Sequence, residues 1–164
     1  MNVRGETDLP DSVLERLDIA IASIHMPCFK DERTIDNVTA AYEKVMEHPY
    51  VDIIGHPDDG RFPVDMKRLV KKAKETGTLL EVNNSSLRPE GFRENTKENC
   101  LEMVKECKAQ GVMIVLGSDS HVDADIAEYP YAEEILRETD FPEELVANVS
   151  LEKLKACIKH GKKL

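Results

Sequence analysis

Several features are scarce or missing in this sequence, and each absence excludes a class of protein. The 164 residues contain no Trp and only 5% aromatic residues, although the 41% hydrophobic content is ordinary for a soluble globular domain. No apolar stretch approaches the roughly 18 residues of a membrane-spanning helix, and no signal peptide is visible. Lys and Arg number 22 against 32 Asp and Glu, which gives a net charge of −10. A general affinity for nucleic acid or for an anionic membrane surface is therefore not expected.

Cysteine pairs of the CxxC type are also missing. The four cysteines are scattered, and Cys100 and Cys107 stand at helical spacing among apolar residues. Buried free thiols are thus the favoured interpretation, and we expect a reducing cytoplasm as the compartment. The acidity does not exclude a small phosphorylated substrate, because metal ions can reverse the local charge of a site.

The chain alternates between strand patterns and helix patterns. Strands are predicted over 17–24, 51–55 and 78–82, within 111–121, and as a last short strand over 146–149. Helices are predicted over 13–17, 31–47 and 96–110, from Pro63 to a stop at Gly77, from Pro130, and from 151 to 158. Glycines that stop helices directly before strands favour a mostly parallel α/β sheet. We expect a single domain over residues 1–164.

The stretch from Gly111 to His121 carries the most chemistry. A short apolar run, suited to a strand buried on both faces, leads into Ser118-Asp119-Ser120-His121. Asp119 and His121 at the end of a strand are good ligands for a borderline divalent ion such as zinc. The alternative is that Ser118 or Asp119 caps a following helix and that His121 is a surface residue.

Other predicted strands end in similar residues. His25 and His56 each follow a strand, and Asn83-Asn84-Ser85-Ser86 follows the third, where an ordinary polar loop is the preferred interpretation over substrate binding. The carboxyl ends of parallel strands share one rim, so these side chains converge with Asp119 and His121. A metal site explains this convergence better than a purely structural role of these side chains does. His48 and His160 are expected to be helix-end or surface histidines.

Four segments in order carry a family resemblance: His25-Met26-Pro27, Ile54-Gly55-His56-Pro57, 80–86 and 116–121. They resemble successive motifs of the PHP (polymerase and histidinol phosphatase) superfamily, in its YcdX-like branch of small bacterial phosphatases. The resemblance covers essentially the whole chain, and 141–142 with 148–150 is similar to the end of that branch. It implies a distorted (βα)7 barrel with mostly parallel strands and a trinuclear metal centre that hydrolyses phosphate monoesters.

The resemblance also implies roles for individual residues. His25 and His56 match ligands of one metal ion, Asp119 a ligand of a second, and His121 a ligand of the third. Asp119 and His121 are the expected catalytic residues, and Asn84 and Ser85 the expected substrate-binding residues. The implied cofactor is a set of divalent metal ions, zinc first, with manganese or iron as alternatives.

The sequence departs from the family at one end. The family's domain opens with a His-x-His motif, further histidines and a metal-bridging glutamate, whereas no histidine precedes His25 here. The chain resembles the last two thirds of such a domain, so we expect a homo-oligomer or a partner for a missing N-terminal segment. The first hypothesis is a metal-dependent phosphoric ester hydrolase, and the alternative is a non-catalytic metal-binding or interaction module. An amidohydrolase-like barrel is disfavoured because no predicted strand holds a lysine.

Overall fold

The computed structural model describes residues 1–30 and 32–159. Position 31, the predicted start of the second helix, and His160 lie outside the described residues. The helices of the described part are α1 (Asp11–Leu14), α2 (Ile35–Met46), α3 (Met66–Thr76), α4 (Thr96–Gln110), α5 (Pro130–Glu138) and α6 (Leu151–Cys157). The strands are β1 (Ile21–Ala22), β2 (Ile53–Ile54), β3 (Leu79–Asn83) and β4 (Ile114–Gly117). The predicted strand–helix alternation is confirmed, although β1 and β2 are shorter than predicted.

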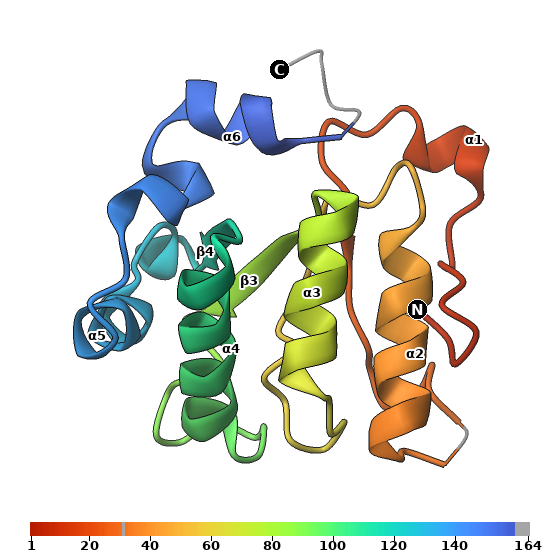
Figure 1. Ribbon diagram of the computed structural model, residues 1–164, viewed down its shortest axis with the longest axis horizontal. Coiled ribbons are helices and arrows are strands. Elements are labelled where there is room, and N and C mark those ends of the chain that lie inside the picture. The colour runs from red at the N-terminus through yellow and green to blue at the C-terminus, as the bar shows by residue number, and fades with distance from the viewer. Residues whose placement is uncertain (31, 160–164) are drawn as a thin grey trace.

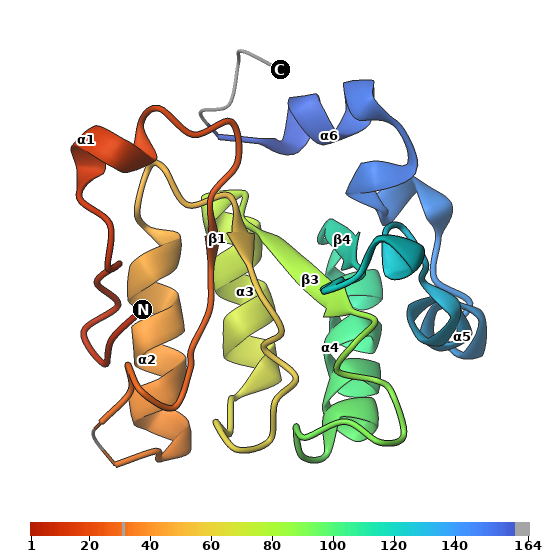
Figure 2. The same ribbon diagram turned by 180° about the vertical axis from the view of Figure 1, so that it is seen from behind.

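The four strands form one parallel sheet in the order β1-β2-β3-β4. Helices α2, α3 and α4 lie side by side over one face of this sheet, as the two opposite views in Figures 1 and 2 show. Each helix therefore carries the chain back so that the next strand runs in the same direction, as parallel pairing requires. The carboxyl ends of the strands and their loops gather at one end, and α6 crosses the other (Figure 1).

The main hydrophobic core lies between the sheet and its helices. Val38, Val45 and Leu69 are fully buried from the helix side, and Ile54 and Leu80 from the strand side. Burying a side chain of this size stabilises the fold by about 1.5–3 kcal/mol. A smaller cluster on the opposite face of the sheet contains Ile53, Leu79, Val115 and Ala147.

Helix ends follow the local sequence closely. Gly77 and Gly111 end α3 and α4 in the left-handed conformation, both at φ 68°, as predicted. The predicted start of α3 at Pro63 is wrong: the helix begins at Met66, because the Asp65 side chain accepts a hydrogen bond from the Arg68 N–H and caps it.

The two edges of the sheet differ. Along β4, the Asn148 side chain accepts from the Leu116 N–H and donates to the Leu116 carbonyl, both at 3.0 Å. The predicted strand over 146–149 is wrong, because only a bridge between Ile114 and Val146 forms and 147–149 is a 3-10 turn. At the other edge, Ile21 of β1 is 58% exposed. Among the described residues, no helix is long and apolar enough to cross a membrane.

Candidate functional site

Two histidines meet at the ends of β1 and β2. The rings of His25 and His56 pack edge to face, with their centroids 4.9 Å apart and their planes at 75°. His25 is exposed and is hydrogen-bonded through Nε2 to Ser23 Oγ at 2.9 Å. His56 is only 7% exposed, and its Nδ1 has no hydrogen-bond partner within the described part of the chain.

Both imidazoles are neutral at pH 7. Burial lowers the pKa of His56 to about 4, and the positive charge of Arg93 acts in the same direction. Burial and Arg93 also lower the pKa of His25. A neutral imidazole keeps one nitrogen lone pair, which a metal ligand or a general base requires.

Glu81 lies beneath His56. It points from β3 to the face of the sheet opposite the helices and is 8% exposed, and its Oε2 accepts the backbone N–H of His56 at 2.8 Å. Asn83 Nδ2 donates to the same oxygen at 3.2 Å, and burial raises the pKa of the carboxyl. A Cβ at Gly117 of β4 would overlap this carboxylate, so a larger residue there would have to displace the buried Glu81 side chain. The signal for Glu81 in the sequence was a single acidic residue inside an apolar strand.

The Glu81 contact also supports an unusual backbone conformation. His56 has φ 34°, in the left-handed region that residues other than glycine rarely occupy. The hydrogen bond from its N–H to Glu81 holds the loop in this conformation. Glu81 thus helps to set the position of the buried imidazole.

Asp119 and His121 follow β4, as predicted. Asp119 is also left-handed, at φ 50°, and its side chain is 32% exposed. Burial favours the neutral carboxyl, but the hydrogen bond and charge of Arg93 outweigh it and lower the pKa of Asp119. His121 is exposed, and its Nδ1–H donates to the Asp119 carbonyl at 3.0 Å. No α-helix begins at 118–120, so the predicted helix cap is wrong, whereas the surface position of His121 in that alternative is confirmed.

The structure places Asn84 and Ser85 differently from each other. Asn84 is 1% exposed, and its Oδ1 accepts the backbone N–H groups of Tyr131 and Ala132 at 2.9 and 3.1 Å. This side chain therefore caps the first turn of α5. Ser85 is half-buried and lines a hollow of about 280 Å³ together with Phe92 and Arg93. The substrate-binding role of both residues stays a prediction.

Two neighbouring carboxylates follow His56. Asp59 accepts from Arg61 through both oxygens, with Nε–Oδ1 at 2.9 Å and Nη2–Oδ2 at 2.6 Å. Asp58 is 1% exposed, and neither of its carboxylate oxygens has a hydrogen-bond partner among the described residues. Burial raises the pKa of Asp58 to about 7.

The described residues supply only part of a metal site. Nowhere in 1–30 and 32–159 do three His, Cys, Asp or Glu side chains come together so that they could hold a metal ion. His25 and His56 pack together and Asp119 lies near enough to affect the pKa of both, whereas His121 bonds within its own loop, to the Asp119 carbonyl. A catalytic zinc ion needs about three protein ligands, so these residues alone do not fit one.

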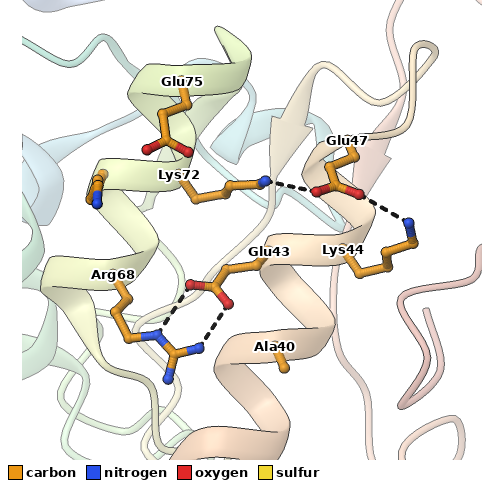
Figure 3. A pocket seen from close by; sticks show the side chains of 8 residues that line it. Ala40, Glu43, Lys44, Glu47, Arg68, Lys72 and Glu75 are labelled. Atoms are coloured by element: carbon orange, nitrogen blue, oxygen red, sulfur yellow. Dashed lines mark hydrogen bonds and ion pairs between the residues drawn. The ribbon is translucent and has the colours of Figure 1, made fainter.

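A second hollow lies away from these residues, between α2 and α3 (Figure 3). Five of its charged side chains are already paired: Arg68 binds Glu43 at 2.8 Å, and Lys72 and Lys44 bind Glu47 at 2.8 and 2.9 Å. Charges neutralised by one another offer little to a ligand. The carboxyl ends of the strands are therefore the stronger candidate site.

Comparisons with known proteins identify relatives. No protein-family model matches the chain. It is 45% identical over its full length to a probable phosphatase of Clostridium novyi (strain NT), and 42% identical over 96% of its length to a probable phosphatase of Acetivibrio thermocellus. It spans 66% and 64% of these two relatives, or just under two thirds of their lengths.

A probable phosphatase of Caldicellulosiruptor saccharolyticus is 38% identical over the full chain, which covers 67% of that protein. Identity of this size over this share of both sequences reflects common descent. The chain therefore belongs to the family of these bacterial proteins named probable phosphatases.

Proposed function

We propose that this chain forms part of a metal-dependent phosphatase that hydrolyses phosphate monoesters, with its site at the carboxyl ends of the sheet. The observation that carries the proposal is the contact between His25 and His56 at the ends of two parallel strands, with Asp119 of the β4 end close enough to act on the pKa of both, in a relative of probable phosphatases. Open α/β sheets place their chemistry at this end.

The protonation states support metal binding. A metal ligand must be deprotonated, and the two imidazoles are neutral while Asp119 is ionised at pH 7. We assign His25, His56, Asp119 and His121 as the ligands that this chain contributes, and zinc as the metal, with manganese or iron as alternatives. Further ligands would come from a second chain or from residues outside these 164, because the donor set described above is incomplete.

Within such a site the chain's own residues have separate tasks. The bound metal would supply charge for the phosphate oxygens and lower the pKa of a water molecule. Asp119 and His121 are the proposed catalytic residues, and Ser85, with Asn84 behind it, is proposed to contact the substrate. The Glu81 carboxylate holds the His56 loop through a backbone hydrogen bond and so keeps the imidazole in place.

We also propose that the sheet is part of a PHP-type (βα)7 barrel. Consecutive parallel strands with helices on one face are the arrangement that a (βα) barrel repeats, and its inner face would be the one that carries Glu81. The exposed edge at β1 would then pair with a further strand, from a second copy of this chain or from a segment outside it. Four unpaired cysteines support a reducing cytoplasm as its compartment.

Metal content and turnover of the purified chain test the proposal. Elemental analysis and hydrolysis of p-nitrophenyl phosphate would be measured for the wild type, His25→Ala and Asp119→Ala. His48→Ala is the matched control, because His48 pairs with Asp11 near α1, away from the strand ends. We expect stoichiometric metal and turnover in the wild type and the control, and the loss of both in the two site variants.

The incomplete donor set favours one competing function, a non-catalytic metal-binding or interaction module. Metal bound without turnover would support this alternative. Turnover that survives both substitutions would contradict the proposed site. A chain that holds no metal and has no activity would show that these residues alone do not form the centre.

A further inference from the structure

The Arg93 side chain joins the ends of β3 and β4 at the candidate site through its hydrogen bonds. We propose that Arg93 is a positioning residue that fixes the Asp119 carboxylate against the end of β3. The proposal rests on the proposed phosphatase function for its effect on turnover. The contact itself is tested independently below.

The guanidinium is held firmly at the β3 end. Its Nη1 donates to Ser86 Oγ at 2.7 Å and to Asn83 Oδ1 at 3.3 Å. Asn83 and Ser86 are 1% and 2% exposed, and the Arg93 side chain is 6% exposed. A buried group with two buried acceptors has little freedom to move, so it is a rigid support for whatever its other end binds.

The other end of the guanidinium binds Asp119. Its Nη2 donates to Asp119 Oδ2 at 3.1 Å. Asp119 occupies the left-handed backbone region, which residues other than glycine rarely adopt and which persists where the surroundings hold it. The contact with Arg93 helps to hold this backbone conformation. It also fixes the orientation of the Asp119 carboxylate, which is about one third exposed.

Arg93 cannot be replaced simply by another positive charge. Its planar fork reaches acceptors from two strand ends at once, whereas the ammonium of lysine is a single compact point. The nearby Asp59 is hydrogen-bonded to Arg61. The Asp59 Oδ2 atom lies 4.0 Å from Arg93 Nε, beyond hydrogen-bond distance. The partners of Arg93 therefore require its shape as well as its charge.

Kinetics on the full chain test the positioning role. Arg93→Met, Arg93→Lys and Arg93→Ala would be compared in p-nitrophenyl phosphate hydrolysis. We expect kcat to fall by about 10–100-fold in each, with KM changed by less than about threefold, since the supports of a ligating carboxylate contribute on this scale. Added guanidinium ion should restore part of kcat in Arg93→Ala. Unchanged kcat, or a loss confined to KM, would overturn the proposal.

Arg68→Met is the matched control, because Arg68 also makes several ion pairs but lies between α2 and α3 (Figure 3). We expect its kcat to equal that of the wild type. An equal loss in Arg68→Met would show a general effect of removing an ion-paired arginine, and would overturn the specific role.

A double-mutant cycle on stability does not depend on turnover. Urea unfolding of Arg93→Met, Asp119→Asn and the double variant measures whether the two side chains interact. We expect the double variant to be less destabilised than the sum of the single variants. Additive losses would overturn the contact. A wild type without turnover but with a non-additive cycle would overturn the proposed function and keep the Arg93–Asp119 link.

Discussion

At the residue scale, Asp58 stands out as a buried carboxylate without a hydrogen-bond partner among the described residues. An unsatisfied buried polar group costs about 1–3 kcal/mol, and more when it is charged. Burial is the main cause of its raised pKa, while the nearby backbone N–H of Asp58 itself and the charge of Arg93 oppose the shift and Glu81 and Asp59 add to it.

Asp58 therefore gives a pH dependence with a definite sign. Its pKa rises from an ordinary 3.8 to about 7 in the folded chain, so the folded state binds the proton more tightly between these pH values. The contribution of Asp58 to stability is complete below its ordinary pKa of 3.8 and is lost as the pH rises from there through about 7. Asp58→Asn should remove this loss and raise the free energy of unfolding at pH 8 by about 1–3 kcal/mol.

Urea unfolding of Asp58→Asn at pH 5 and pH 8 measures this effect. Asp59→Asn is the control, because Asp59 binds Arg61 through both oxygens and its removal should destabilise the fold. A variant at Asp58 that is less stable than the wild type at pH 8 would contradict the prediction.

Gly117 gives a second prediction at this scale. A Cβ there would overlap the Glu81 carboxylate, so Gly117→Ala should destabilise the fold by about 1–3 kcal/mol. Glu81→Ala in the same chain opens the space and should remove most of the added cost. Chemical denaturation of the two single variants and the double variant measures this. Equal costs of Gly117→Ala in both backgrounds would show that the overlap is not the cause.

At the element scale, the Asn84 side chain caps the N-terminal turn of α5. Asn84→Ala should lower stability by about 0.5–2 kcal/mol, because the N–H groups of Tyr131 and Ala132 lose their acceptor. Asn84→Asp keeps an acceptor and should retain most of the stability. Thermal unfolding with parallel KM measurements separates this role from substrate binding. A higher KM in both variants with unchanged stability would favour the substrate role.

At the scale of the whole molecule, the two edges of the sheet differ. Asn148 covers β4 by bonding both backbone groups of Leu116, whereas β1 ends the sheet with Ile21 58% exposed. An uncovered edge strand with an exposed apolar side chain favours pairing with another chain. This is the physical basis of the proposed homo-oligomer.

Ile21→Thr should therefore reduce self-association without a large loss of stability. Ile35→Thr is the control, because Ile35 is 53% exposed at the start of α2 and lies away from the sheet edge. Light scattering after size-exclusion chromatography would give the mass of each variant. A wild type that is monomeric, or an oligomer that Ile21→Thr leaves intact, would contradict the prediction.

The sequence alone determined the features that depend on neighbouring residues. The alternation of strands and helices, the ends of α3 and α4 at Gly77 and Gly111 and the bounds of α4 follow from local periodicity and backbone preference. The sequence also shows the polar residues after each strand. Their location at one end of the sheet follows because parallel strands bring their carboxyl ends together. These are statements about one segment at a time.

Only the tertiary structure decided which of those residues meet. Glu81 binds the His56 backbone across 25 positions, Arg93 binds Asp119 across 26, and Asn84 caps α5 across 47. No local pattern encodes such contacts, because they depend on how neighbouring strands and loops pack. The lengths of β1 and β2, and the bridge in place of a strand at Val146, likewise depend on which backbone lies alongside and not on the local sequence.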